Sequence, residues 1–244
     1  MLNNILNITI IGTMVGIIGT GIGGLIAFVN DNPDNKFMSL ILGTAGGLML
    51  SVVTFDLLPE SFELGGIPLS IAGLVAGVIS TTLIDEYLPD FDSISKDRGK
   101  YFKMGLLMAI GLALHNFPEG LAIGSGFAAG KSLGIGLSIV IGLHDIPEGM
   151  AVAAPMSVSG IDKFKVVGYT LLTAVPTGVG AFVGALIGEI SPAFITLCMA
   201  FAGGTMLYIV CGELIPKSRS LFESFLSTFG IIAGIIAGII ITRL

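Results

Sequence analysis

The sequence predicts an all-α membrane protein with eight transmembrane helices in a 3+2+3 arrangement, in which helices 1–3 and 6–8 form an inverted repeat. Three observations predict this fold. Only 11% of the 244 residues are charged and 53% are hydrophobic, whereas soluble domains carry roughly 25% charged residues. Apolar runs long enough to span a bilayer recur along the whole chain. Segments from the two ends of the chain also resemble each other at one constant offset.

Apolar runs of about 20 residues, separated by polar or Pro/Gly breaks, define the eight spans. They cover residues 5–29, 37–62, 67–87, 101–127, 132–157, 164–188, 192–215 and 221–242. The one longer connection, about 88–100, is polar, so we expect residues 1–244 to form a single polytopic transmembrane domain. The first run is too long for a cleaved signal peptide and has no basic residue before it, which predicts a retained span.

The basic residues predict the orientation. Nine of them follow odd-numbered spans: Lys36, Lys96, Arg98, Lys100, Lys103, Lys163, Lys165, Lys217 and Arg219. Lys131 and Arg243 lie on the other side. By the positive-inside rule, the loop at 88–100 is cytoplasmic and both termini are extracytoplasmic, in a multi-pass protein of the cell membrane. The chain has no basic cluster that would indicate binding to nucleic acid.

The internal repeat has an offset of 157 residues. Residues 46–61 (GGLMLSVVTFDLLPES) align with residues 203–218 (GGTMLYIVCGELIPKS), with eight of 16 positions identical. The same offset aligns 69–79 with 226–236, and 20–23 with 177–180. Two three-span units separated by two spans enter the membrane in opposite directions, a plan common in secondary transporters. Convergence of Gly/Ile-rich helices is the alternative, but it does not explain one offset in three segments.

The two spans outside the repeat each carry a related polar motif. Residues 115–120 read HNFPEG, residues 144–149 read HDIPEG, and these motifs contain the only two histidines of the chain. On a helix, residues four apart share one face, so His115 pairs with Glu119 and His144 with Glu148. Two such faces in contact would form a site for zinc or a similar divalent ion. The alternative is a purely structural polar cluster.

Asn116 and Asp145 each follow a histidine and lie about 100° further around the helix. They would serve an adjacent oxygen-rich site, with Glu119 and Glu148 as bridging ligands. Without metal, closely spaced buried carboxylates cannot all remain ionised at low cost, so we expect metal binding to release protons.

Three more carboxylates are candidates for a cation pathway: Asp56, Glu60 and Glu213. The first two lie at the outer end of span two and the third near the inner end of span seven. The alternative is that these charges are simply solvated. Glycines spaced four apart in spans three and eight indicate close helix packing inside the bundle or, as a second interpretation, a homodimer contact.

The paired motifs resemble the signatures of the ZIP (Zrt/Irt-like) family of divalent metal transporters, and DLLPES and ELIPKS occur at the expected places. The resemblance covers the whole chain. It implies transport of Zn²⁺, and also of Fe²⁺, Mn²⁺, Co²⁺ or Cd²⁺, toward the cytoplasm. It also implies a main metal site formed by His115, Glu119, His144 and Glu148. Asn116 and Asp145 would join the two glutamates at a second site.

The sequence departs from the family pattern at one point. Many members have a glutamate just before the proline of span six, and here Val175 takes that place, so a second metal would lack this ligand. A membrane-embedded metalloenzyme is the alternative function, but no HExxH motif is present and the inverted repeat favours transport. A sensor without flux would need a soluble output domain. We therefore expect a transporter rather than an enzyme, with metal ions and the lipid bilayer as partners.

Overall fold

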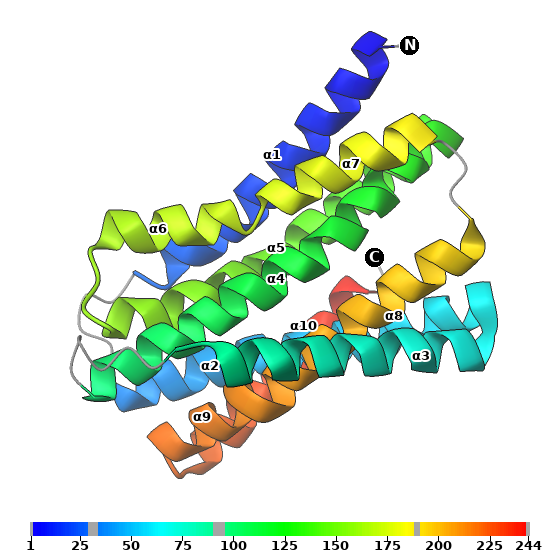
Figure 1. The fold of residues 1–244 in the computed structure, drawn as a ribbon. Helices are drawn as coiled ribbons and strands as arrows, with labels where there is room; N and C mark the ends of the chain where they lie inside the picture. The colour runs from blue at the N-terminus through cyan, green and yellow to red at the C-terminus, as the bar shows by residue number, and fades with distance from the viewer. Residues whose placement is uncertain (1, 29–33, 90–95, 188–190, 243–244) are drawn as a thin grey trace.

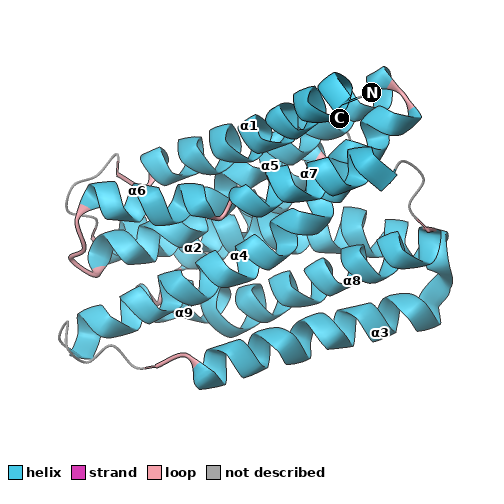
Figure 2. Cartoon of the chain, turned by 45° about the horizontal axis from the view of Figure 1, so that its top comes forward, coloured by secondary structure: helices cyan, strands magenta, loops and turns pink. Residues whose placement is uncertain are grey.

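The computed structural model describes residues 2–28, 34–89, 96–187 and 191–242, and the regular structure within these ranges is helical (Figures 1 and 2). The helices of the first half are α1 (Leu2–Ile26), α2 (Asn35–Val52), η1 (Val53–Leu57), α3 (Leu58–Tyr87), α4 (Lys96–Ala129) and α5 (Lys131–Val158). Those of the second half are α6 (Lys163–Leu172), α7 (Val175–Ile187), α8 (Pro192–Ile209), η3 (Val210–Leu214), α9 (Ile215–Leu221) and α10 (Phe225–Ile241). Among the described residues, six helical stretches are long and apolar enough to cross a membrane, as expected for an all-α multi-pass protein.

The helices pack in two groups. In one group, α1 packs on α5 and α7, and α4 packs on α5 and α7. In the other, α3 packs on α8 and α2 packs on α10. The groups meet mainly where α2 contacts α5 and where α4 contacts α8. In both views α4 and α5 pass through the middle of the bundle, and the marks for the two ends of the chain lie toward the same end of it (Figures 1 and 2).

The helices differ from the predicted spans in several places. Predicted span six is interrupted, because α6 ends at Leu172 and Pro176 in the first turn of α7 has no N–H to donate to the Leu172 carbonyl. α4 begins at Lys96 rather than 101, and helix continues from α8 to Leu221 rather than 215. Hydropathy marks the part of a helix that lies in lipid, whereas the helix itself continues into polar surroundings. Some predicted positions lie outside the described residues. They are the last residues of spans one and six (29 and 188), residues 90–95 of the predicted loop, and the basic residue at 243.

Two π-helical segments occur at equivalent places in the repeat. η1 and η3 begin at Val53 and Val210, which are separated by the 157-residue offset. Each is followed by a proline, Pro59 or Pro216, at the start of the next helix. A proline cannot donate to the preceding turn, and a wider π turn accommodates the missing hydrogen bond without ending the helix. Gly66 reverses the chain within α3 with φ 76°, a left-handed value that favours glycine.

The glycines of α3 and α10 allow close helix contacts. A Cβ at Gly77 would overlap the Phe201 carbonyl of α8, and one at Gly234 would overlap the Thr44 carbonyl of α2. These glycines therefore serve packing within the chain, in agreement with the first interpretation of the spacing. A homodimer contact would need a different surface.

We predict that Gly77→Ala lowers the melting temperature of the detergent-solubilised protein by roughly 2–12 °C, because overpacking costs about 1–3 kcal/mol. Thermal denaturation followed by size-exclusion chromatography measures this. Gly168→Ala is the control, since a Cβ at Gly168 meets no atom within 4 Å. Equal melting temperatures for the two variants would contradict the packing account.

Candidate metal centre

The two polar motifs lie on neighbouring helices in the middle of the bundle. α4 carries His115 and Glu119, α5 carries His144 and Glu148, and the two helices pack against each other. The four side chains are almost fully buried, the most accessible being Glu119 at 5%. Both helices continue through the proline of their motif. Each proline leaves one carbonyl of the preceding turn without its usual donor, which adds to the polar character of the site.

The imidazoles and carboxylates converge. His115 Nε2 lies 3.0 Å from Glu119 Oε1 and 3.4 Å from Glu148 Oε1. His144 Nε2 lies 2.6 Å from the same Glu119 oxygen and donates a hydrogen bond to it. His115, Glu119 and Glu148 offer ligand atoms that all lie within 4.8 Å of one another. Zinc ligands at about 2.0–2.2 Å from one ion are separated by roughly 3–3.5 Å, so small side-chain shifts would suffice to enclose an ion.

Asn116 and Asp145 are buried beside this cluster, and the Asp145 carboxyl is close enough to Glu119 and Glu148 to interact with both. Asn116 Nδ2 donates a 2.7 Å hydrogen bond to the Thr173 carbonyl, in the interruption between α6 and α7. Asp145 faces α1, where its Oδ2 lies 3.2 Å from the place that a Cβ on Gly19 would occupy. Val175, at the start of α7, is 48% exposed. The helix break thus contributes a backbone acceptor for Asn116. The sequence of α7 contains no carboxylate that could serve as a further metal ligand.

The role of the Thr173 carbonyl as the acceptor for Asn116 was not predicted from the sequence. A backbone carbonyl carries no side-chain motif, and the only signal was Pro176, which made a helix interruption foreseeable. Thr177, one turn further along α7, was missed as well, and its buried Oγ1 has no hydrogen-bond partner.

Buried polar atoms without hydrogen-bond partners are concentrated at this site. In the described part of the chain there are ten such side-chain atoms, and nine of them belong to the six residues of the paired motifs. They are His115, Asn116, Glu119, His144, Asp145 and Glu148. A buried polar group without a partner costs about 1–3 kcal/mol or more if charged. A protein that keeps nine of them together is suited to a cation that supplies the missing interactions.

A cavity of about 660 Å³ leads to the cluster. His115, Glu119 and His144 line it together with two of the predicted pathway residues, Asp56 and Glu60. Asp56 belongs to the π segment η1.

Glu213 belongs to the other π segment, η3, and lines a separate cavity of about 350 Å³. The charged residues of that second cavity are Asp85, Lys100, Lys103, Glu213 and Lys217. Asp85 Oδ2 accepts a 2.8 Å hydrogen bond from the hydroxyl of Tyr208. The structure therefore brings Asp56 and Glu60 to the cluster and leaves Glu213 apart from it.

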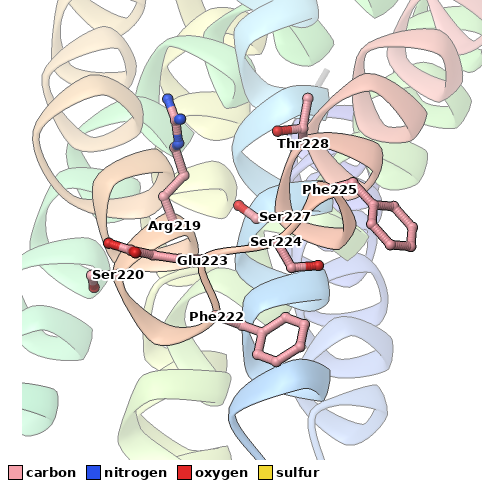
Figure 3. Close-up of a pocket in the computed structure, with 8 residues that line it drawn as sticks. All are labelled: Arg219, Ser220, Phe222, Glu223, Ser224, Phe225, Ser227 and Thr228. Carbon is pink, nitrogen blue, oxygen red and sulfur yellow. The ribbon is translucent and has the colours of Figure 1, made fainter.

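A third cavity, of about 570 Å³, lies at the turn between α9 and α10 (Figure 3). It is lined by Arg219, Ser220, Phe222, Glu223, Ser224, Phe225, Ser227 and Thr228. It contains none of the residues of the paired motifs, so it is not part of the candidate metal centre.

The buried cluster of imidazoles and carboxylates in a membrane bundle defines the class of protein, an integral membrane protein that handles divalent metal ions. The chain belongs to the ZIP zinc transporter family, whose family model matches residues 92–242. Membership assigns it to a family of metal-ion transporters rather than enzymes, with zinc as the favoured substrate.

The most similar relatives include proteins named zinc transporter ZupT. Those of Chlorobium phaeovibrioides and Corynebacterium glutamicum are 35% and 34% identical over 244 and 247 residues, and both alignments cover 91% of this chain. They cover 92% and 93% of the relatives. That of Akkermansia muciniphila is 33% identical over 262 residues and 96% of each chain. The resemblance stated from the motifs is therefore confirmed.

We predict that Zn²⁺ at 100 times its dissociation constant stabilises the protein by about 2.7 kcal/mol and raises its melting temperature by roughly 5–10 °C. Glu148→Gln should lose most of this increase, because it removes a buried ligand charge. Thermal denaturation of chelator-treated protein with and without Zn²⁺ tests this. Glu63→Gln, at an exposed position, is the matched control, and an unchanged increase in Glu148→Gln would be evidence against the site.

Proposed function

We propose that the chain carries zinc across the cell membrane toward the cytoplasm through a metal site between α4 and α5. The main ligands are His115, Glu119, His144 and Glu148. The observation that carries this proposal is the convergence of their buried imidazole and carboxylate atoms, nearly all without other partners, beside an accessible cavity. Polar groups at this depth in a bundle are expensive and are normally retained for function.

The proposed topology has eight crossings in a 3+2+3 arrangement, within one domain of residues 1–244. The apolar stretch Asn35–Tyr87 has 53 residues and would rise about 80 Å as one helix, whereas a bilayer core is about 30 Å thick. The reversal at Gly66 divides it into two crossings. α10 is the last crossing, and the helices then make eight crossings in all. The 157-residue offset between η1 and η3 supports the inverted repeat.

The proposed direction follows from the position of the charges. Thr242, close to the C-terminus, lines the same cavity as Asp56 and Glu60. The other charged cavity contains three lysines that the positive-inside rule assigns to the cytoplasm. With both termini extracytoplasmic, the cavity that reaches the metal ligands opens to the outside. Zinc would enter past Asp56 and Glu60 and leave past Glu213.

The ligand set also supports a range of metals. Two imidazoles with two carboxylates suit Zn²⁺ and other borderline ions, so we propose that Cd²⁺, Fe²⁺, Mn²⁺ and Co²⁺ compete for the site. Asn116 and Asp145 would extend it with oxygen ligands. Since Val175 adds no carboxylate, the second position would bind metal more weakly than the first.

Flux through liposomes tests the proposal. Protein reconstituted in vesicles that contain a zinc-sensitive dye should give Zn²⁺ influx, and Glu119→Ala and Glu148→Ala should each reduce it by at least about 100-fold, the effect expected from losing roughly 2.7 kcal/mol of ligand binding. Glu63→Ala, which alters an exposed carboxylate outside the cavity, serves as the control. Equal influx in the parent and both site variants would refute the transport site proposed here.

A further inference from the structure

The cavities that contain the predicted pathway residues are arranged in series along one face of the continuous helical stretch formed by α8 and η3. Met199 and Ala202 line the cavity that reaches the metal cluster. Met206 and Ile209 line a much smaller void. Glu213, four residues further, lines the lysine-containing cavity. Residues spaced three or four apart share one side of a helix, so α8 and η3 together follow a single path past all three spaces.

α4 follows the same path. His115 and Glu119 line the cavity of the metal cluster, Met108 and Gly111 line the small void, and Lys103, Met104 and Leu107 line the cavity beyond it. Glu148 of the metal cluster also lines the small void. The void is therefore the next space along the path from the metal ligands to the lysine-containing cavity.

This middle void is a constriction. It holds about 10 Å³, close to the space of one water molecule, whereas the cavities on either side hold about 660 and 350 Å³. Three methionines from three helices close it: Met49 of α2, Met108 of α4 and Met206 of α8. Each is at most 3% exposed.

The side chains that line the constriction offer an ion few ligand atoms. The described residues that line it are Met49, Met108, Gly111, Leu112, Glu148, Ala151, Val152, Met206 and Ile209. Apart from the Glu148 carboxylate, the only side-chain atoms with lone pairs are the three thioether sulfurs. A divalent cation that passes through so narrow a space leaves most of its water behind and needs replacement ligands, because an unliganded charge in apolar surroundings is very costly.

We infer that Met49, Met108 and Met206 form a methionine gate, a closed inner gate whose thioethers ligate the metal as it leaves Glu148 and favour soft ions. Thioether sulfur is a soft ligand, so the methionine gate favours Cd²⁺, the softer ion, over Zn²⁺. Ordinary core packing by flexible methionines is the competing explanation, and it assigns no role to the sulfur atoms. The inference rests on the proposed function, because it requires the metal to move from Glu148 toward Glu213.

The test replaces sulfur and keeps the apolar volume. In the triple variant M49L/M108L/M206L, leucine fills nearly the same space as methionine. The void therefore stays closed by apolar side chains, while the three thioether ligands are lost. Uptake of Cd²⁺ and of Zn²⁺ into liposomes, measured as metal content at equal concentrations, gives a transport ratio for each variant. The ratio of Cd²⁺ to Zn²⁺ uptake should fall about threefold relative to the parent, equivalent to roughly 0.7 kcal/mol.

The matched control is M38L/M156L, which changes two equally buried methionines that do not line the void and should leave the ratio unchanged. If the triple variant does not fold, the three single Met→Leu variants should each lower the ratio. An unchanged ratio in the folded variants, or a parent that carries no Cd²⁺, would overturn the methionine gate. Zinc influx in the parent that Glu148→Ala abolishes would still uphold the proposed function, whereas influx that survives in Glu148→Ala would refute both.

Discussion

The burial of two imidazoles and three carboxylates in the middle of an apolar bundle is the constraint on which the rest of the structure depends. Nine polar atoms of the paired motifs have no hydrogen-bond partner, and removing charged groups from water is repaid only by close opposite charge. In the proposed function, a divalent cation supplies that charge for both helices at once. α4 and α5 lie in the centre (Figure 1), where neighbouring helices exclude water from the motif side chains, and one cavity reaches His115, Glu119 and His144.

In the proposed function, the surrounding helices provide an ion path with different properties at its two ends. The cavity that reaches the ligands is open, while the step beyond Glu148 is nearly filled by methionine side chains. The two π segments place Asp56 and Glu213 at the cavities on either side of this step. Two halves of related sequence thus supply a carboxylate to each cavity, and a transporter needs such access from each side in turn rather than from both together.

Much of the candidate site was predictable from the sequence, because the positions of its side chains depend on helical periodicity. Histidine and glutamate four residues apart share a face, and two such faces in a bundle are expected to meet, as those of His115 and His144 do. The Asn116 bond to the Thr173 carbonyl was not predictable, since its acceptor is backbone freed by a helix interruption. Likewise, Met49, Met108 and Met206 are far apart in sequence, and buried methionines resemble ordinary core residues until packing brings them to one void.

The location of the bound ion tests the central claim most directly. Crystals of the protein soaked with Zn²⁺, or grown with it, would show the ion by its anomalous scattering at the zinc edge. The account predicts a peak between α4 and α5, with a histidine nitrogen and carboxylate oxygens of Glu119 and Glu148 at about 2.0–2.2 Å. Anomalous density confined to other places, such as the cavity lined by Glu213, with none between the two helices, would contradict it.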